Sequence, residues 1–309
     1  MSHFTHLSNT YQGIYINLER SKDRNVYIQA HLQELELAPY FKRFEAIDGS
    51  LYAPPTSKHK LTNREKACFK SHLLAIEKHE HLGKHLHIVE DDTIMHLDTK
   101  KTLYHCLCEV HFDDFDIIFC GTTMWDLSAQ LYDSCMQTNK FDYQLFDLGK
   151  PLNYSGLHSY LVHKNSIHKI LKLLKKHKFT NSIDLVLRYF IENKVLKAYC
   201  IMPMLAKPNC DFVSNIDPLG SDRNPQHNLG QRAFLHEHFA HLYDLFYKGA
   251  KLEDIYHKIV ASLHKQGVCT ENTTNTPSIL DLMAFLLKHS LAILGQHHNI
   301  TLLPDPKID

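Results

Sequence analysis

Short apolar runs rich in β-branched and aromatic residues alternate with segments of helical periodicity over residues 13–201. The apolar runs predict strands at 13–18, 41–47, 87–90, 115–121, 160–162 and 195–201. The periodic segments predict helices at 23–37, 62–83, 99–110, 166–177 and 183–193. Thr62 and Glu65 form a capping-box pattern at the start of the second helix. This alternation is typical of an α/β fold with a largely parallel sheet.

The chain of 309 residues is long for a single core, which favours either one main domain with a sizeable addition or two domains. Four prolines between residues 203 and 225 indicate a loop and a boundary. We therefore expect a first domain at 1–225 and a helical C-terminal region at 226–309. Tyrosine and phenylalanine alternate with other residues at 130–149, which predicts a hairpin inserted in the first domain.

The apolar segment at 277–294 predicts a terminal helix. Asp281 and Lys288 interrupt it and it is short for a bilayer, so a packed helix is favoured over a face that contacts a membrane surface or a partner. Residues 1–12 are polar and lack the apolar core of a signal peptide. We expect a cytoplasmic protein, with any peripheral contact at the cytoplasmic face of the membrane.

Lysine and arginine number 34, as do aspartate and glutamate, so overall charge gives no reason to expect nucleic acid as a partner. The eight cysteines form no Cys-x-x-Cys pair and several lie in apolar runs, which indicates reduced, buried thiols. Histidines at 79–87 and 236–241 have spacings that a zinc site could use, but the further ligands are not evident. His-rich surface helices are the preferred interpretation of both groups.

The apolar run that ends at Val89 is followed directly by three carboxylates, Glu90, Asp91 and Asp92. Adjacent acids repel one another, which is most easily tolerated where a strand leaves a sheet and a cation or a donor-rich ligand neutralises them. In open α/β sheets, ligands bind at the carboxyl ends of the strands. The run therefore predicts a hard-metal site at a strand tip, with a solvated acidic turn as the alternative.

The acidic run is the last of four motifs that occur in a definite order. They are Ile16-Asn17-Leu18 with Arg20 and Asp23-Arg24; Phe44 to Gly49; Leu61, Glu65, Cys68 and Ser71-His72; and Ile88 to Asp92. Further matching positions are 160–174, Ile183-Asp184, Pro203, Ser214 and Ile216. Over roughly residues 11–216 the chain resembles family 25 of the glycosyltransferases, the bacterial lipo-oligosaccharide galactosyltransferase group that also includes collagen galactosyltransferase domains.

The resemblance implies a GT-A-type fold in which a UDP-sugar lies across the carboxyl ends of the strands, and Mn²⁺ or Mg²⁺ bridges its diphosphate to the acidic motif. These cations prefer oxygen ligands and usually take one or two protein carboxylates. Because alternate residues of a strand share a face, we expect Asp92 as a direct ligand and Glu90 as a ligand either directly or through water. The bound cation would stabilise the departing UDP.

Nucleotide contacts are expected from Asn17, Arg20 and Arg24, which lie at or just after the first strand. Arg24 offers two parallel donors to diphosphate oxygens, although an ordinary salt bridge on the first helix would account for it equally well. Asp48 would accept hydrogen bonds from ribose or uracil. The alternative for Asp48 is an Asx turn, which an Asp-Gly pair favours by itself.

The remaining candidate site residues are Ser71, His72 and Asp184. Ser71 and His72 match the family motif and are expected to bind or position the substrate, although a lone helical histidine is more often structural. The family transfers sugars with inversion, which needs a base to remove the proton of the acceptor hydroxyl. Asp184 is the candidate base, and a carboxylate that interacts with a helix N-terminus is the equally simple alternative.

We therefore expect a metal-dependent transferase that moves a hexose, galactose foremost, from a UDP-sugar to a hydroxyl of a glycan or a surface glycolipid. Departures from the family pattern at Arg64, Ala67, Thr93 and His158-Ser159 affect the expected donor sugar and acceptor pocket rather than the metal and nucleotide residues. Two other functions remain open. One is a catalytically degenerate transferase that serves for binding or scaffolding, and the other is a metal-dependent phosphoester hydrolase.

Overall fold

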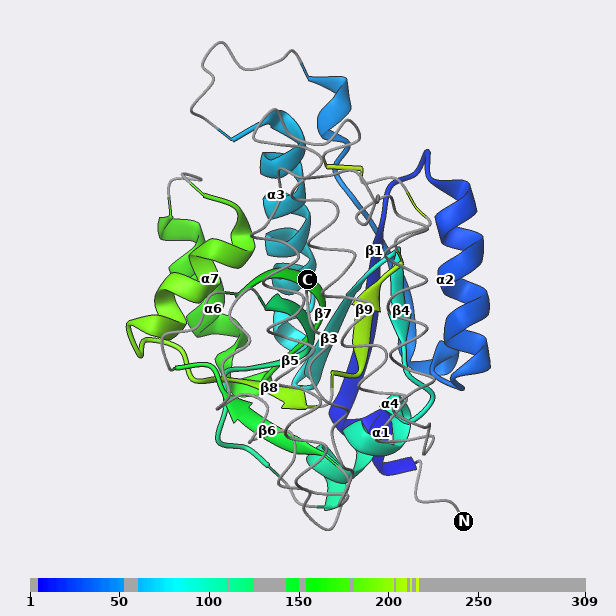
Figure 1. Cartoon of the computed structure of the whole chain (residues 1–309), viewed down its shortest axis with the longest axis vertical. Coiled ribbons are helices and arrows are strands. Elements are labelled where there is room, and N and C mark those ends of the chain that lie inside the picture. The colour runs from blue at the N-terminus through cyan, green and yellow to red at the C-terminus, as the bar shows by residue number, and fades with distance from the viewer. Residues whose placement is uncertain are drawn as a thin grey trace, which may run out of the picture.

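The structure is a computed structural model that describes residues 5–52, 61–109, 112–124, 143–149, 154–177, 181–202, 204–209, 212 and 215–216. Most of the expected hairpin at 130–149, the expected boundary at 225 and the helical region at 226–309 lie outside the described residues. Within them, strands and helices alternate along the chain, as the sequence predicts (Figure 1).

Most of the expected helices and strands are present near their predicted positions, but the helix at Thr5–Thr10 was not predicted and the strand expected at 160–162 begins at Tyr154. The helices are α1 (Thr5–Thr10), α2 (Lys22–Glu34), α3 (Asn63–Lys78), α4 (Thr99–Tyr104), α6 (Ile167–Lys176) and α7 (Ile183–Glu192), and His105–Glu109 forms a π-helical turn. The strands are β1 (Tyr11–Asn17), β2 (Phe41–Glu45), β3 (His85–Glu90), β4 (Thr93–Met95), β5 (Ile117–Met124), β6 (Gln144–Asp147), β7 (Tyr154–Val162), β8 (Ala198–Met202) and β9 (Ala206–Pro208). The capping box of Thr62 and Glu65 is confirmed at the start of α3.

The central sheet of the described chain has seven strands in the order β2-β1-β3-β7-β5-β8-β6. Strands β1, β2, β3, β5 and β8 share one direction, whereas β7 and β6 run against them. The sheet is therefore mixed, and the expectation of a largely parallel sheet holds only in part, because β7 lies antiparallel between β3 and β5. Continuous apolar runs indicate strands that are buried on both faces, but they do not indicate strand direction.

A second, two-stranded sheet joins β4 to β9 and was not predicted. Both of its strands are three residues long, too short to give a clear alternation of apolar and polar residues. Strand β6, the described part of the expected hairpin, pairs with the distant β8. The described residues therefore assign 144–147 to an edge of the central sheet.

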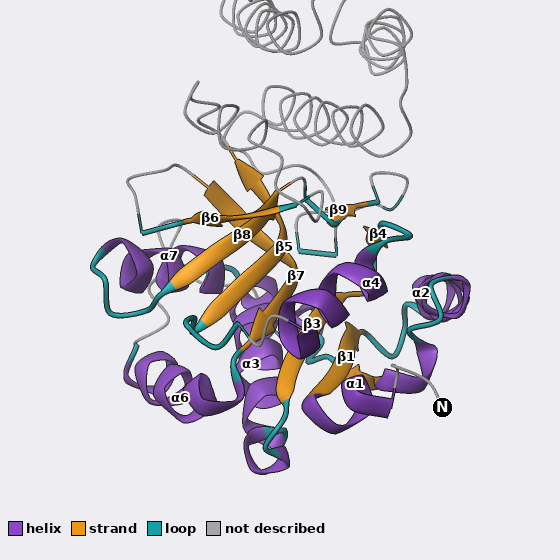
Figure 2. Ribbon diagram, turned by 90° about the horizontal axis from the view of Figure 1, so that it is seen from below, coloured by secondary structure: helices purple, strands orange, loops and turns teal. Residues whose placement is uncertain are grey.

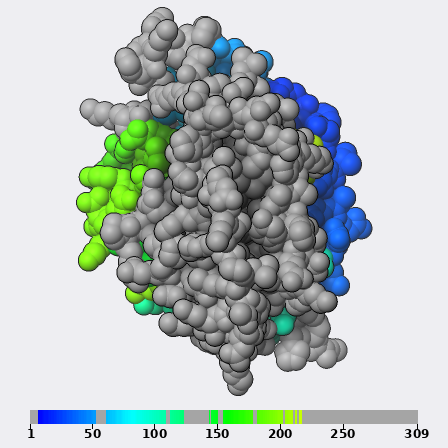
Figure 3. All heavy atoms as spheres, in the orientation of Figure 1, coloured from blue at the N-terminus to red at the C-terminus, as the bar shows by residue number. Residues whose placement is uncertain are grey.

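Helices cover both faces of the central sheet (Figure 2). On one face α3, α6 and α7 pack their apolar side chains, including Phe69, Ile170 and Val186, on the strands. On the other face α1, α2 and α4 contribute Leu7, Ile28 and Leu103 to a second apolar cluster. In the space-filling view, α2 lies on the opposite side of the molecule from α6 and α7 (Figure 3). The carboxyl ends of β1, β2 and β3 thus open between α2 and α3.

Gly121 allows the segment that carries β9 to pass close to β5. A Cβ atom at residue 121 would lie 2.0 Å from the carbonyl oxygen of Ala206, so a side chain does not fit here. The Leu205 amide donates to the Cys120 carbonyl at 2.8 Å, and the His96 amide donates to the Leu205 carbonyl at 2.8 Å. These contacts hold β9 against β4, directly after the acidic run.

Three of the four histidines at 79–87 are buried, so the interpretation of this group as surface residues is wrong for His79, His85 and His87. His87 is fully buried, with Nδ1 2.6 Å from the Tyr11 hydroxyl and Nε2 2.7 Å from the Ser159 hydroxyl. Burial lowers the pKa of His87 to about 3. Burial and the neighbouring His163 lower the pKa of His85 to about 3 as well.

Two further sequence expectations can be compared with the described part of the chain. The cysteines described there, Cys68, Cys106, Cys108, Cys120 and Cys200, are all free thiols, in line with the expectation of reduced cysteines. Among the described residues, no helix combines the length and the apolar character needed to cross a membrane. The apolar segment at 277–294 lies outside that search.

Neutral burial of His87 makes the protein less stable in acid. The unfolded chain takes up this proton at a pKa of about 6.5, whereas the folded chain resists it down to about 3. Stability present above pH 6.5 is therefore lost as the pH falls toward 3. Between about pH 7.5 and pH 5.0, the free energy of unfolding should lose about 2 kcal/mol through His87 alone.

Urea unfolding of the wild type and of His87→Gln at these two pH values measures this contribution, because glutamine can still hydrogen-bond the two hydroxyls without titrating. The pH-dependent loss should be smaller by about 2 kcal/mol in His87→Gln. The exposed His81 provides the control variant, His81→Gln. Equal losses in both variants would contradict the assignment.

Candidate active site

A cavity opens at the carboxyl ends of β1, β2 and β3, where the sequence places the acidic run. It encloses about 690 Å³ of space, including the part open to solvent. The residues around it are Ile16, Leu18, Arg20, Arg24, Ala46, Ile47, Asp48, Gly49, Arg64, Cys68, Ser71, His72, Glu90, Asp91, Asp92, Asn215 and Ile216. Of the site residues expected from the sequence, Asn17 and Asp184 are not part of this lining.

The three carboxylates differ in their access to the cavity. Asp91 is buried, whereas Glu90 and Asp92 keep 26% and 19% of their side chains exposed. The Asn17 Nδ2 group donates to Asp91 Oδ2 at 2.7 Å, and Asn17 Oδ1 accepts from Arg43 Nε at 2.9 Å. Asn17 therefore orients Asp91 from behind the cavity, and a direct contact between Asn17 and a nucleotide stays a prediction.

Arg24 joins the first turn of α2 to the acidic run. Its Nη1 group donates to Asp91 Oδ1 at 2.9 Å and to Asp92 Oδ2 at 2.8 Å. Only 6% of the Arg24 side chain is exposed, and the Phe212 ring lies 5.1 Å from its guanidinium carbon. Arg24 is thus part of a buried charge cluster and differs from the exposed salt bridge that the sequence left open.

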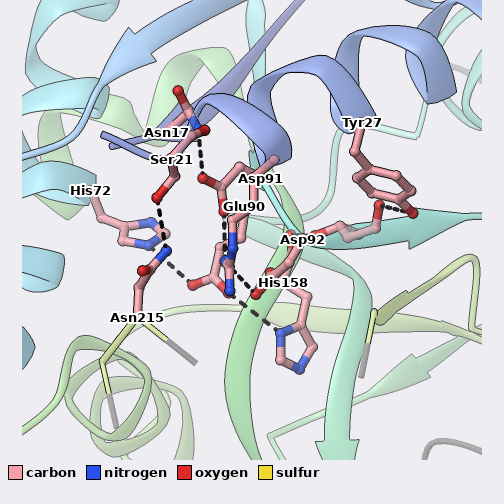
Figure 4. Close-up of polar contacts among 11 residues, drawn as sticks. Asn17, Ser21, Tyr27, His72, Glu90, Asp91, Asp92, His158 and Asn215 are labelled. Carbon is pink, nitrogen blue, oxygen red and sulfur yellow. Dashed lines mark hydrogen bonds and ion pairs between the residues drawn. The ribbon is translucent and has the colours of Figure 1, made fainter. Parts of the chain in front are cut away.

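The Glu90 carboxylate lies between two imidazoles, His72 on α3 and His158 on β7 (Figure 4). Oε1 is 3.5 Å from His72 Nε2, and Oε2 is 3.5 Å from His158 Nδ1. On its far side, His72 Nδ1 contacts the Tyr160 hydroxyl at 2.9 Å. Burial alone would raise the pKa of Glu90, but the two imidazoles outweigh burial and hold that pKa well below its usual range.

The pKa values of Asp91 and Asp92 shift in the opposite direction, upward. Burial, together with the charges of Glu90 and Asp91, raises the pKa of Asp92 to about 6 despite the neighbouring Arg24. Burial also raises the pKa of Asp91, although Arg24 and Asn17 counteract it. Negative charge has therefore accumulated in a partly closed cavity, which favours a cationic ligand.

Two further candidates hold the loop after β2. Both oxygens of Asp48 are engaged, because Oδ1 accepts from the Ser50 amide at 2.9 Å and Oδ2 accepts from Arg20 Nε at 2.7 Å. This is the capping turn that the Asp-Gly pair allows. The Ser71 hydroxyl donates to the Ala67 carbonyl at 2.7 Å and accepts from the Ile47 amide at 2.9 Å, which ties the loop to α3.

Glycine is required next to Asp48. A Cβ atom on Gly49 would lie 2.4 Å from the Asn63 carbonyl oxygen and 2.6 Å from the Arg64 Cα atom. The loop after β2 can therefore approach the first turn of α3 only because residue 49 has no side chain. This approach brings Asp48 and Arg64 to the same wall of the cavity.

Asp184 lies in the first turn of α7, where a helix N-terminus favours a carboxylate. Its Oδ2 accepts a hydrogen bond from the Gly156 amide of β7 at 2.8 Å. The neighbouring Ile183 is buried. The structure thus gives Asp184 a bond that anchors α7 to β7, and its service as a base stays a prediction.

His158 is the site residue that sequence reasoning missed as a functional group. The antiparallel register of β3 and β7 pairs Ile88 with Tyr160 and Val89 with Ser159, so the next step places Glu90 opposite His158. Directly opposed side chains of an antiparallel pair interact. The sequence showed only that His158 departs from the family pattern, because the neighbour of β3 in the sheet is a matter of tertiary structure.

Replacing Arg24 by glutamine should destabilise the fold strongly. The change leaves two partly buried carboxylates without their cation, which typically costs about 3–5 kcal/mol of unfolding free energy. Arg20→Gln is the matched control, because it breaks an ion pair whose arginine is 48% exposed and should cost less than about 1 kcal/mol. Urea unfolding near neutral pH measures both changes. A cost for Arg24→Gln no larger than that for Arg20→Gln would contradict the buried-cluster description.

One comparison with known proteins found a match. The family described as Glycosyltransferase family 25 (LPS biosynthesis protein) matches residues 12–187, which is more than half of the chain and includes β1, α3 and the acidic run. A comparison with curated proteins found no match. The resemblance seen in the four sequence motifs is thereby confirmed: the chain belongs to family 25 of the glycosyltransferases.

Proposed function

We propose that the protein transfers a hexose, galactose foremost, from a UDP-sugar to a hydroxyl of a glycan or glycolipid, with a divalent cation and with a GT-A-type domain. The observation that carries the proposal is the mixture of charges in one cavity, which carboxylates line together with Arg20, Arg24 and Arg64. A nucleoside diphosphate bound through a divalent cation needs this mixture. The cation binds carboxylate oxygens, and the phosphates accept from guanidinium groups.

The carboxylates of Glu90 and Asp92 suit Mn²⁺ or Mg²⁺. Both belong to the cavity lining and offer the oxygen ligands that these cations prefer. Burial and the neighbouring negative charges raise the pKa of Asp92, and a bound cation would relieve both effects. In this proposal Asp92 is a direct ligand, Glu90 assists directly or through water, and the bound cation supplies stabilisation of the charge that develops on the departing UDP.

The nucleotide would lie between α2 and the loop after β2. Leu18, Ala46 and Ile47 give this part of the cavity apolar surface for a base or a ribose. Arg20 and Arg64 are close enough to the same cavity to donate to phosphate oxygens. Arg24 donates to the acidic run, so we assign it to holding Asp91 and Asp92 in place as well as to the diphosphate.

An inverting transfer also requires a base on the acceptor side. We keep Asp184 in this role, because it contacts Gly156 of β7, the strand that also carries His158 beside Glu90. Its hydrogen bond to the Gly156 amide uses one oxygen and fixes the orientation of the other.

Asp92→Asn tests the metal assignment. Loss of a charged ligand should lower Mn²⁺-dependent transfer from UDP-galactose by more than about 100-fold, while the fold is retained. The measurement is UDP release with an acceptor panel, with and without a chelator. Glu36→Gln removes an exposed carboxylate paired with Lys100 and is the control that should keep full activity. Full metal-dependent activity in Asp92→Asn would contradict the metal assignment.

The same assay separates the competing functions. UDP binding without turnover on any acceptor would favour a degenerate transferase that serves for binding. Phosphate release from simple esters, without a preference for nucleotide sugars, would favour a phosphoester hydrolase. A thermal-shift screen of UDP-, GDP-, CMP- and dTDP-sugars with Mn²⁺ identifies the donor, because a bound ligand stabilises the native state.

Asp184→Asn tests the proposed base. The amide oxygen of asparagine can still accept from the Gly156 amide, so the fold should be preserved. We expect the turnover number to fall by about 10²–10⁴-fold with little change in UDP-sugar affinity. The readouts are single-turnover transfer and the thermal shift produced by UDP. An unchanged turnover number would leave Asp184 with only its contact to β7.

A further inference from the structure

Three chemically different ligand groups meet at the wall of the cavity formed by α3. The Cys68 Sγ atom, a ring nitrogen of His72 and a carboxylate oxygen of Glu90 all lie within 4.8 Å of one another. Cys68 and His72 are four residues apart on α3, which puts them on one face of the helix in successive turns. All three side chains belong to the cavity lining.

The separation between His72 and Glu90 fits a shared cation better than a hydrogen bond. His72 Nε2 and Glu90 Oε1 are 3.5 Å apart, whereas N–H···O hydrogen bonds usually measure about 2.7–3.2 Å. Two ligands on a tetrahedral zinc ion, with bonds of about 2.0–2.2 Å, lie about 3.3–3.5 Å apart. The observed spacing therefore leaves room for an ion with little movement of either side chain.

The surroundings of His72 suit the same role. The Tyr160 hydroxyl is 2.9 Å from Nδ1, and when Nδ1 donates its proton to that hydroxyl, the Nε2 lone pair is available to a cation shared with Glu90. Ligating histidines are commonly oriented by a hydrogen bond from their other ring nitrogen. Tyr160 and His72 are both almost fully buried, so this orientation is fixed by packing.

A second cluster, formed by His85, Asp113 and His163 at the opposite end of β3, differs from the Cys68 cluster in its hydrogen bonding. His163 Nε2 lies 3.1 Å from Asp113 Oδ1, within hydrogen-bonding distance. His163 Nδ1 accepts from the Asn165 amide at 3.2 Å, so the ring proton must be on Nε2. That proton is donated to Asp113, and the lone pair that a metal would need is absent there. The His163–Asp113 pair is thus an ordinary hydrogen bond, whereas the His72–Glu90 pair is longer.

We propose that Cys68, His72 and Glu90 form a binding site for a thiolate- and imidazole-preferring divalent cation of the Zn²⁺ class. Three protein ligands with a fourth position open to the cavity are the usual arrangement of accessible zinc sites. The site differs from the oxygen-ligand position at Asp92, because sulfur and imidazole ligands select against Mg²⁺. It does not depend on the transfer reaction.

Cobalt(II) is the probe that tests this site in the full-length protein. A thiolate ligand gives Co²⁺ a charge-transfer band in the near ultraviolet, which oxygen and nitrogen ligands do not give. We expect this band in the wild type, its loss in Cys68→Ser, and its displacement by equimolar Zn²⁺ but not by excess Mg²⁺. Cys108→Ser is the matched control, since Cys108 is also a half-buried free thiol, and it should keep the band.

Two further measurements keep the result decisive. Asp92→Asn should retain the cobalt band, and loss of the band there would contradict a site whose protein ligands are Cys68, His72 and Glu90. Should Cys68→Ser fail to fold, alkylation of the wild type followed by mass spectrometry replaces it. Zn²⁺ should then slow the labelling of Cys68 more than about tenfold and leave Cys108 unaffected. No band in the wild type, or a band that survives in folded Cys68→Ser, would overturn the proposal.

Discussion

The contact of Arg24 with Asp91 and Asp92 holds the site together. Three consecutive acids leave the sheet at the end of β3, and a single guanidinium at the start of α2 donates to two of them. Asn17, at the end of β1, fixes the remaining oxygen of Asp91. The charges of Asp91 and Asp92 are therefore compensated only when β1, α2 and β3 lie in their native relative positions. A buried ion pair of this kind orients groups more than it stabilises the fold.

Much of the fold could be predicted from the sequence because its signals are local. The strand, helix and capping-box patterns of β1, α2, β2, α3 and β3 depend on neighbouring residues, and the structure confirms them. The direction of β7, the pairing of β6 with β8 and the small β4–β9 sheet depend on contacts between distant segments. The short strand β9 (Ala206–Pro208) pairs with β4 where the chain passes close to Gly121 of β5. A lone glycine in the sequence does not reveal this close approach.

In the candidate site, too, local features could be predicted from the sequence, whereas contacts between distant segments could not. Arg20, Asp48, His72 and the acidic run, which the motifs single out, line one cavity, because each follows or faces a strand end. What the sequence could not give is which groups neutralise one another. For Arg24 the sequence left a diphosphate contact and an ordinary salt bridge open, and the structure shows that it donates to the acidic run. His158 faces Glu90 only because β7 is the neighbour of β3.

Glu90 links the oxygen-ligand side of the cavity to the α3 side. One of its oxygens faces His72 and the other faces His158, so a cation held by either edge changes the charge that the opposite edge experiences. The acidic run carries three carboxylates against the charge of Arg24, an excess that one divalent ion balances. A second divalent ion would need further negative charge, which the diphosphate of a nucleotide-sugar donor could supply. Occupation of both positions at once should therefore be favoured when an anionic donor is bound.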